Sequence, residues 1–440
     1  MATILLKDGQ VGCGLGVYDA DVLIEDNKIV NTFDWGKEIK ADKVIDCKGK
    51  LILPGLIDAH VHMREPGQSY KEDWETGSKA AVAGGITTVF DMPNNQPPIL
   101  TVKDLDAKRA LIADRSYCNY GLFIGFNGKN ISEINKAKNI AGVKVYAATS
   151  TGNMIVGGGD IEKLFKKCNK TIVVHAEDEV SIAENTETYL AEFDGREIDP
   201  SIHSKIRSPE CAAKAVKFVC ELAKKSGHKL HVAHVSSDQE IAVILEYRDS
   251  GVTCEVSPHH LLLSEDDYGQ LNNFIKVNPP VRSRTNVFGM WKALKFGEID
   301  IVATDHAPHT FVEKQQGYMQ APSGMPELET LLPIMLNAVN SEGLEVKELV
   351  KLCCEGPAKL FGVKGKGQIE VGFDADIVVV DMDMEREVKN EELFTKCGWS
   401  PYHGSVFKGW PIMTFVGGEL VFKGGKVVGK KVGKEVEFEG

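Results

Sequence analysis

The chain has 440 residues, of which 43% are hydrophobic and 26% are charged, as in an ordinary soluble globular protein. Its net charge of −12 argues against nucleic acid or an anionic membrane as a partner. No apolar run approaches the roughly 20 residues that cross a bilayer, and the N-terminal stretch lacks the basic leader and apolar core of a signal peptide. Ten cysteines without any CxxC pair fit buried thiols, so we expect a cytoplasmic protein.

The chain begins with short alternating runs separated by Asp, Asn and Gly turns over residues 1–52, which is typical of antiparallel β-structure. Over residues 53–365 the pattern changes to short β-type runs, many of which end in a polar residue, alternating with helix-like stretches. The runs are "LILPGLIDAHVH", "GITTVFDMPN", "NYGLFIGF", "GVKVYAAT", "TIVVHAED", "KLHVAHVSS", "VTCEVSPHH" and "DIVATDHAPH". The clearest helix-like stretches are 102–115, 209–226, 238–249 and 284–296.

Eight strand–helix units predict an α/β fold, a parallel sheet closed into a (β/α)₈ TIM barrel. Residues 366–440 return to the alternating pattern of the N-terminal segment. We therefore predict two domains: a catalytic barrel over 53–365 and a small composite β-sandwich formed by 1–52 together with 366–440.

Polar side chains fall at or near the ends of the predicted barrel strands, where such barrels carry their chemistry. They are His60, His62, Asn94, Lys144, His175, His234 and Asp305. Many strands end in a polar residue simply because loops are polar. Seven side chains of these types at one rim nevertheless favour a functional site.

Zinc prefers imidazole and carboxylate ligands, and a catalytic zinc site leaves one position open for water. His60 and His62 alternate on one strand, so they point to the same face. His175, His234 and Asp305 add two imidazoles and a carboxylate from other strand ends. Five ligands exceed the needs of one tetrahedral ion, so the pattern predicts two ions roughly 3.5–4 Å apart.

Lys144 does not fit a cationic site at first sight, because two divalent ions would repel its ammonium group. From chemistry alone we favour a surface or rim position for Lys144. The alternative is that a buried Lys144 loses its proton and reacts with carbon dioxide. The resulting carbamate would be an anionic ligand able to bridge both ions.

The other histidines are weaker candidates. His231 lies three positions before His234, so on a strand it would face outward and pack between the barrel and its helices. His259 and His260 end the seventh strand, and either could orient a ligand. The remaining three are expected at the surface or in loops: His203, His228 and His403.

The motifs "DAHVHMREPG" and "ATDHAPHTFVEK" together resemble the two signatures of the dihydroorotases in the cyclic amidohydrolase superfamily. Six shorter motifs follow in family order: "GITTVFDMPNN", "GVKVYAA", "VVHAED", "HVAHVSS", "KVNPPVRS" and "DADIVVVD". The resemblance implies a (β/α)₈ barrel with a composite β-sandwich and two Zn²⁺ ions per subunit.

Carried over residue by residue, the resemblance implies that His60, His62 and Asp305 bind the more buried ion. It implies that His175 and His234 bind the second ion. Lys144 lies where many family members have a carboxylated lysine that bridges the two metals, although some have an aspartate. The resemblance therefore reverses the preference drawn from chemistry alone.

The resemblance also implies a substrate pair, N-carbamoyl-L-aspartate and (S)-dihydroorotate, which interconvert with loss or gain of water in pyrimidine (UMP) biosynthesis. Arg64 shares the strand face of His60 and His62, and its guanidinium fork matches a carboxylate. The competing interpretation for Arg64 is an ion pair with Glu65 or another surface acid. Asp305 is the expected catalytic residue, a general base that then acts as acid.

Four further residues match substrate contacts of the family. Asn94 and His309 match contacts to the carboxylate, and Asn278 and Ser323 match contacts to the ring. The Gly-, Thr- and Ser-rich stretch 149–159 has the composition of a mobile loop that closes over substrate.

Two other functions compete with this prediction. Allantoinases and hydantoinases or dihydropyrimidinases share the HxH strand, but Arg64 and His309 favour a substrate with a carboxylate. A non-catalytic scaffolding homologue should lack one or more of the six metal-type residues, and all six are present. The expected partner is thus a small molecule, with a homodimer as the ordinary assembly of such an enzyme.

Overall fold

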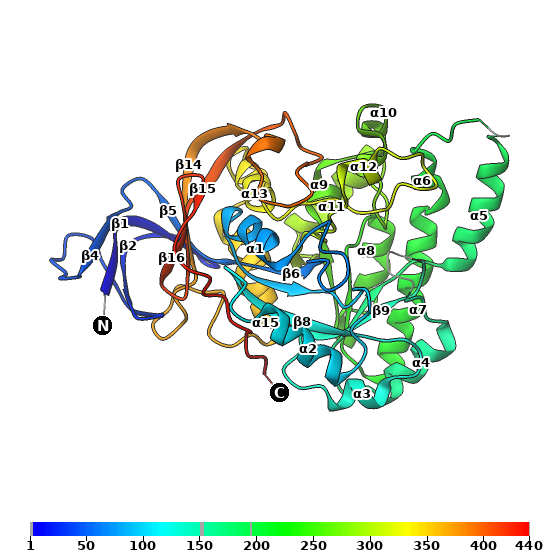
Figure 1. Ribbon diagram of the computed structural model, residues 1–440, viewed down its shortest axis with the longest axis horizontal. Helices are drawn as coiled ribbons and strands as arrows, with labels where there is room; N and C mark the ends of the chain where they lie inside the picture. The colour runs from blue at the N-terminus through cyan, green and yellow to red at the C-terminus, as the bar shows by residue number, and fades with distance from the viewer. Residues whose placement is uncertain (1–2, 150–153, 194–195, 440) are drawn as a thin grey trace.

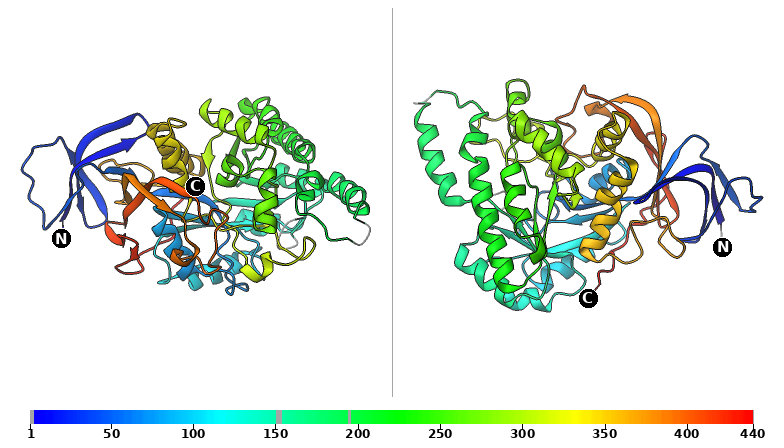
Figure 2. Two further views of the ribbon diagram at one scale, coloured as in Figure 1. Left: turned by 90° about the horizontal axis from the view of Figure 1, so that it is seen from above. Right: turned by 180° about the vertical axis from the view of Figure 1, so that it is seen from behind.

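The computed structural model describes residues 3–149, 154–193 and 196–439. A barrel surrounded by helices makes up the larger part, and a curled sheet lies beside it, on the left in Figure 1. Figure 2 shows the same two parts from above and from behind. The N-terminus lies in the sheet, and the chain ends beneath the barrel near α15 (Gly356–Phe361).

Eight parallel strands form the barrel, in the order of the chain. They are β6 (Leu56–Val61), β7 (Ile86–Asp91), β8 (Asn119–Gly125), β9 (Gly142–Tyr146), β10 (Ile172–His175), β11 (Leu230–Val232), β12 (Val252–Val256) and β13 (Ile301–Val302). A bridge between Val61 and His306 joins the first strand to the chain just after the last, and the His62 N–H donates to the His306 carbonyl at 2.8 Å. The predicted (β/α)₈ barrel is confirmed.

Helices cover the outside of the barrel and its loops. They are α1 (Trp74–Ala83), α2 (Val102–Ile112), α3 (Ile131–Lys136), α4 (Gly158–Lys167), α5 (Glu179–Ala191), α6 (Ile202–Ile206), α7 (Pro209–Ser226), α8 (Asp238–Leu245), α9 (Pro258–Leu262), α10 (Tyr268–Leu271), α11 (Arg284–Lys295), α12 (Phe311–Lys314), α13 (Leu331–Asn340), α14 (Val346–Val350) and α15. Four of them coincide with the helix-like stretches of the sequence, because apolar residues recur at helical spacing there: α2, α7, α8 and α11.

The two ends of the chain build one nine-stranded, mostly antiparallel sheet, as predicted from their alternating patterns. Its strands are β1 (Thr3–Cys13), β2 (Gly16–Glu25), β3 (Lys28–Phe33), β4 (Lys43–Asp46), β5 (Leu51–Pro54), β14 (Ile377–Glu387), β15 (Val406–Val416), β16 (Glu419–Lys423) and β17 (Lys426–Val427). The sheet curls until β3 meets the chain before β14, where the Ile29 N–H donates to the Phe373 carbonyl at 2.9 Å. It encloses its own apolar core, which includes Leu6, Val22, Ile52, Val379 and Phe415.

The run "LILPGLIDAHVH", which we predicted as one strand, is divided at Gly55. β5 before it pairs in the curled sheet, and β6 after it opens the barrel. A Cβ at position 55 would lie 2.2 Å from the Thr87 side chain, so this close approach of two strands requires glycine.

The segment 388–405, between β14 and β15, leaves the sheet and lies against the barrel. The indole N–H of Trp399 donates to the His309 carbonyl at 2.7 Å, and the Tyr402 hydroxyl donates to the buried Glu327. The backbone N–H of Phe394 donates to Glu329 at 2.9 Å. The curled sheet therefore contributes structure to the loops at the strand ends of the barrel.

The C-terminal residues close the opposite end of the barrel. The Tyr120 N–H donates to the Lys434 carbonyl at 2.9 Å, and the Val436 N–H donates back to Tyr120 at 2.8 Å. The Phe438 ring packs edge-on against Phe90, with ring centroids 5.3 Å apart, in a cluster that also holds Phe361.

Replacing Phe438 with alanine should lower the free energy of unfolding by about 3 kcal/mol, because it removes a nearly buried ring and leaves a cavity. Urea denaturation followed by circular dichroism measures the change. Phe288→Ala is the matched control, since that ring is 72% exposed and its loss should cost less than about 0.5 kcal/mol. Equal shifts for the two variants would contradict the proposed packing role of Phe438.

Candidate active site

Three of the predicted ligands form one compact group at the strand ends. His60 belongs to β6, His62 follows it directly, and Asp305 lies three residues beyond β13. The Nε2 atoms of His62 and His60 are 3.0 and 3.4 Å from Asp305 Oδ1. One ligand atom from each residue lies within 4.8 Å of the others, and all three side chains are buried. This group has the residue types and spacing of a site for a divalent metal ion.

A second pair of histidines adjoins this group. His175 ends β10, and His234 lies just past β11 with a left-handed backbone (φ 37°). The two rings meet edge to face, with centroids 4.8 Å apart, and His175 Nδ1 lies 3.1 Å from His234 Nε2. The His234 ring centroid is 5.2 Å from that of His60, so the pair and the first group can share one centre.

Lys144 lies between these groups and is fully buried, so the rim position that chemistry alone favoured is wrong. Its Nζ is 3.2 Å from His60 Nε2, and burial lowers the pKa of Lys144 to about 8. No carboxylate of the described residues forms an ion pair with Lys144. A buried ammonium without an anionic partner is costly, so this position disfavours the charged form of Lys144.

The protonation states of the group suit a metal ion. Burial lowers the pKa of His62 to about 4 and that of His234 well below its ordinary value. Burial alone would raise the pKa of Asp305, but His60 and His62 hold it well below its usual range. Neutral imidazoles and an ionised carboxylate are the forms that bind metals. The residues present therefore fit the metal that the sequence predicts.

Glu255 on β12 ties the centre together and was not among the residues predicted from sequence. Its carboxylate accepts hydrogen bonds from His60 Nδ1, from His231 Nε2 at 3.0 Å and from the His234 N–H at 3.2 Å. Because Nδ1 of His60 carries the donated proton, Nε2 keeps its lone pair toward Lys144 and Asp305. Glu255 thus fixes the tautomer of a candidate metal ligand.

Two other groups orient candidate ligands in the same way. Glu177 accepts from His175 Nε2 at 2.9 Å; burial would raise its pKa, yet Arg207 and His175 hold it at about 2. The Asn94 side-chain oxygen accepts from His62 Nδ1 at 2.7 Å. Asn94 was predicted to contact substrate, and this bond gives it an orienting contact as well.

The structure corrects two predictions about histidines. His231 points into the barrel, where its ring centroid is 5.7 Å from that of Phe361, because the chain turns at His234 and breaks the strand alternation. His203 is buried rather than at the surface, and its Nε2 donates to Asn278 Oδ1 at 2.8 Å. His259 and His260 are also buried, and His259 Nδ1 donates to Glu327 at 2.8 Å.

Four of the five predicted substrate residues line the same pocket as the candidate ligands, whereas the fully buried His309 is not part of that lining. Among the described residues, the pocket is lined by Arg64, Asn94, Asn278 and Ser323 and by the six metal-type residues. Arg64 is 2% exposed and has a left-handed backbone (φ 59°); its Nε donates to the Pro308 carbonyl at 3.0 Å. Glu65 pairs instead with Arg115 at 3.0 Å, so the competing interpretation of Arg64 as its ion-pair partner is wrong.

Tyr146 is a further pocket residue that sequence analysis missed. It lies two positions after Lys144 on β9, and its hydroxyl is buried without a hydrogen-bond partner among the described residues. Strand alternation could have identified it, since positions 144 and 146 share a face. The central part of the predicted mobile loop 149–159, residues 150–153, lies outside the described residues.

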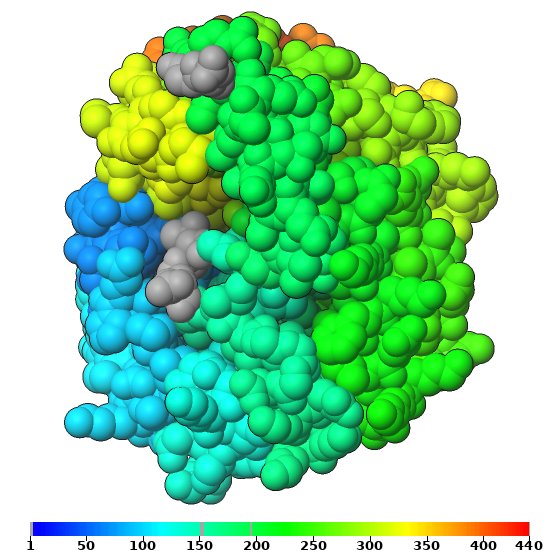
Figure 3. All heavy atoms as spheres, turned by 90° about the vertical axis from the view of Figure 1, so that its right-hand side faces the viewer, coloured from blue at the N-terminus to red at the C-terminus, as the bar shows by residue number. Residues whose placement is uncertain are grey.

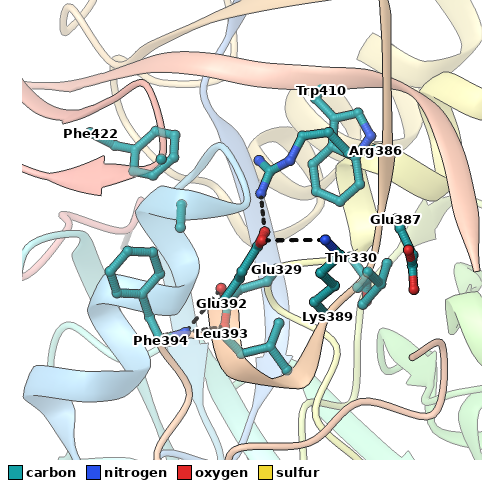
Figure 4. A pocket seen from close by; sticks show the side chains of 13 residues that line it. Glu329, Thr330, Arg386, Glu387, Lys389, Glu392, Leu393, Phe394, Trp410 and Phe422 are labelled. Carbon is teal, nitrogen blue, oxygen red and sulfur yellow. Dashed lines mark hydrogen bonds and ion pairs between the residues drawn. The ribbon is translucent and has the colours of Figure 1, made fainter. Parts of the chain in front are cut away.

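The strand-end face of the molecule is shown in Figure 3, where the blue segment before α1 and the yellow segment that contains α12 lie side by side next to a hollow. Larger cavities lie elsewhere among the described residues, and two of them lie between barrel and sheet. In one of about 320 Å³, Arg386 and Lys389 both turn toward Glu392, and Trp410 lines the wall (Figure 4). The other, of about 720 Å³, is lined by paired lysines and aspartates such as Lys366 and Asp376. Neither contains a predicted site residue.

A closed parallel barrel with histidine and carboxylate groups gathered at its strand ends is the architecture of a metal-dependent enzyme. Among the described helices, none combines the length and the apolar character that a membrane crossing requires.

The amidohydrolase family model matches residues 51–421. Proteins named dihydroorotase from Methanosarcina mazei and Pyrococcus abyssi are 36% and 37% identical to the chain; each alignment covers 96% of it, and 94% and 96% of those relatives. Among solved structures, L-hydantoinase (dihydropyrimidinase) from Arthrobacter aurescens has a TM-score of 0.95 and 31% identity, covering 99% of the chain and 100% of that protein. Dihydropyrimidinase from Brevibacillus agri has a TM-score of 0.92 and 27% identity, with 99% coverage of both. The chain belongs to the amidohydrolase family.

Glu255→Gln should weaken zinc binding about 10- to 100-fold, because the amide no longer holds the His60 and His231 rings by charge-assisted bonds. Competition with a chromophoric chelator measures the zinc affinity directly. Glu246→Gln is the matched control, because Glu246 is exposed, follows α8 directly and does not line the pocket. An unchanged zinc affinity in Glu255→Gln would show that Glu255 does not support the metal site.

Proposed function

We propose that the protein is a zinc-dependent dihydroorotase, which interconverts N-carbamoyl-L-aspartate and (S)-dihydroorotate plus water in pyrimidine biosynthesis. The observation that carries the proposal is the buried Arg64 beside the His60, His62 and Asp305 group. A buried guanidinium requires an anion, and dihydroorotate brings a carboxylate next to its reacting amide. Relatives named dihydroorotase that match almost the whole chain support the same substrate.

The alternative is a hydantoinase or dihydropyrimidinase, the names that the similar solved structures carry. Hydantoin and dihydrouracil are cyclic amides without a carboxylate. Such a substrate would leave Arg64 and the neighbouring His309 without a charged partner in the pocket. We therefore place this function second, and we place an allantoinase with it.

We propose that the site holds two Zn²⁺ ions. His60, His62 and Asp305 would hold one, His175 and His234 the other, and a carboxylated Lys144 would bridge them. Burial of Lys144 without an ionic partner and its contact with His60 support this arrangement. When bound, the ions would lower the pKa of a water molecule and polarise the amide carbonyl.

The chain's own residues would then bind the substrate and transfer the proton of the attacking water. Arg64, Asn94 and His309 would bind the carboxylate, while Asn278 and Ser323 would contact the ring. Asp305, whose low pKa keeps it ionised, would accept the proton of the attacking water and deliver it to the leaving ring nitrogen. In the biosynthetic direction the same carboxyl group would act in reverse.

A non-catalytic scaffolding role is less well supported, because all six metal-type residues are present and lie around one pocket. The homodimer stays a prediction, and neither the proposed reaction nor the proposed metal centre depends on it.

The purified protein should contain about two zinc ions per chain, as a binuclear centre requires, and should hydrolyse dihydroorotate but not dihydrouracil or allantoin. Elemental analysis and parallel assays, including carbamoyl-aspartate cyclisation, measure both properties. Arg64→Met should remove nearly all activity on dihydroorotate because the carboxylate loses its charged partner. Metal together with turnover of dihydrouracil or allantoin instead would keep the metal centre but reject the substrate.

Lys144→Ala should abolish turnover and reduce the zinc content toward one ion per chain, because the bridging anion is lost. Adding a short carboxylic acid such as propionate should restore part of the activity by supplying that anion. Lys163→Ala is the control, since its side chain is 65% exposed and it lies outside the pocket. Full zinc content and full activity in Lys144→Ala would reject the bridge.

A further inference from the structure

His309 is held between two cationic side chains. Its ring is fully buried, with Lys71 Nζ 2.9 Å from Nδ1 and Arg64 Nη2 3.0 Å from Nε2. Nε2 also lies 3.0 Å from the Ser323 carbonyl oxygen. Lys71 was not singled out in the sequence, although it is only 4% exposed.

The chemistry of these contacts fixes the position of the proton on His309. An ammonium group has only donors, so Lys71 can bond Nδ1 only if Nδ1 is unprotonated. A neutral imidazole then carries its one proton on Nε2, which the Ser323 carbonyl accepts in the free protein and which a bound carboxylate would share as a second acceptor. Glu313 lies 2.9 Å from the Lys71 Nζ and favours the charged form that this arrangement requires.

With its proton on Nε2, His309 directs an N–H donor at the N–H donor of Arg64 Nη2. Arg64 Nη2 is also only a donor, so its 3.0 Å contact with the protonated Nε2 is not a hydrogen bond. Two N–H groups that converge in a buried pocket repel each other unless an acceptor with negative charge lies between or beside them. The substrate carboxylate that Arg64 is proposed to bind is such an acceptor.

His309 cannot turn away to relieve this contact. The indole of Trp399 donates to its backbone carbonyl at 2.7 Å, and Lys71 and Ser323 hold the ring on both nitrogens. Lys71 is itself held in place. Its backbone N–H donates to the Gln68 carbonyl at 2.9 Å, and its side-chain ammonium forms an ion pair with Glu313.

We propose that Lys71 is a positioning residue, which holds His309 in its Nε2-protonated form so that His309 and Arg64 present converging donors to the substrate carboxylate. The role of this contact in substrate recognition rests on the proposed function. This arrangement would favour a cyclic substrate that carries a carboxylate over an uncharged one, because only the carboxylate can accept hydrogen bonds from both Arg64 and His309.

The proposal has a consequence for pH dependence. Burial, together with Arg64, Lys71 and Lys314, lowers the pKa of His309 well below its ordinary value, against the opposing effect of the Ser323 carbonyl. The ring is therefore neutral near pH 7, and its tautomer is set by Lys71. Removing the Lys71 ammonium raises the pKa of His309 and frees the tautomer. Lower pH would then protonate both nitrogens and restore the Nε2–H donor.

Steady-state kinetics on dihydroorotate test this role. In Lys71→Met, KM should rise roughly tenfold to a hundredfold, the range expected for a lost charge-assisted hydrogen bond, with kcat and zinc content close to those of the unmodified protein. The KM of Lys71→Met divided by the KM of the unmodified protein should decrease when the pH is lowered from 8 to 6. Lys71→Arg, which keeps a donor-only cation, should restore most of the affinity, and Lys163→Met should change nothing. An unchanged KM, or a loss in kcat alone, would overturn the proposal.

Nitrogen-15 NMR of labelled histidine tests the tautomer without any turnover, using His309→Gln to assign the signal. The unmodified protein should show a neutral His309 protonated on Nε2 between pH 6 and pH 8, and Lys71→Met should show a mixture that titrates. A His309 protonated on Nδ1 in the unmodified protein would overturn the proposal. A correct tautomer in a protein that does not hydrolyse dihydroorotate would instead reject the proposed function and leave the effect of Lys71 on His309 standing.

Discussion

The contact between the first and last strands of the barrel is the constraint on which the site depends. Asp58 on β6 accepts hydrogen bonds from the backbone and the hydroxyl of Thr304, and His62 bonds the backbone of His306. The bonds between Asp58 and Thr304 join residues 246 positions apart in the chain, and the contact brings the HxH pair against Asp305. Closure of the barrel and assembly of the candidate metal group are therefore one event.

The site concentrates conformations and charges that a folded chain otherwise avoids. Arg64, His234 and Asp305 all have positive φ values, which cost roughly 1–3 kcal/mol each for residues other than glycine. Lys144 and Arg64 are buried basic residues, and burial lowers the pKa of His62 and of His309 near Arg64. Such strain persists only where the surrounding structure enforces it: here the Gln68 N–H donates to the Arg64 carbonyl, and the His234 N–H donates to Glu255.

The sequence predicted the barrel, and it singled out strand-end residues that the structure gathers around one pocket, because each barrel strand carries its own local pattern. It missed Glu255 and Lys71, which act through contacts with residues 195 and 238 positions away. Chemistry alone placed Lys144 at the rim because burial is not visible in a single lysine. The orientation of His231 was wrong since the alternation rule fails where His234 leaves the strand.

The segment 388–405, which joins two strands of the curled sheet, supports barrel residues near the candidate site. Trp399 holds the backbone of His309, and Tyr402 holds Glu327, which in turn bonds His259. Trp399 and Tyr402 share an apolar cluster with barrel residues such as Val277 and Met325, so this segment is packed as part of the barrel's strand-end loops. Under the proposed function, a chimera that exchanged segment 388–405 between relatives would take part of its substrate preference from the donor.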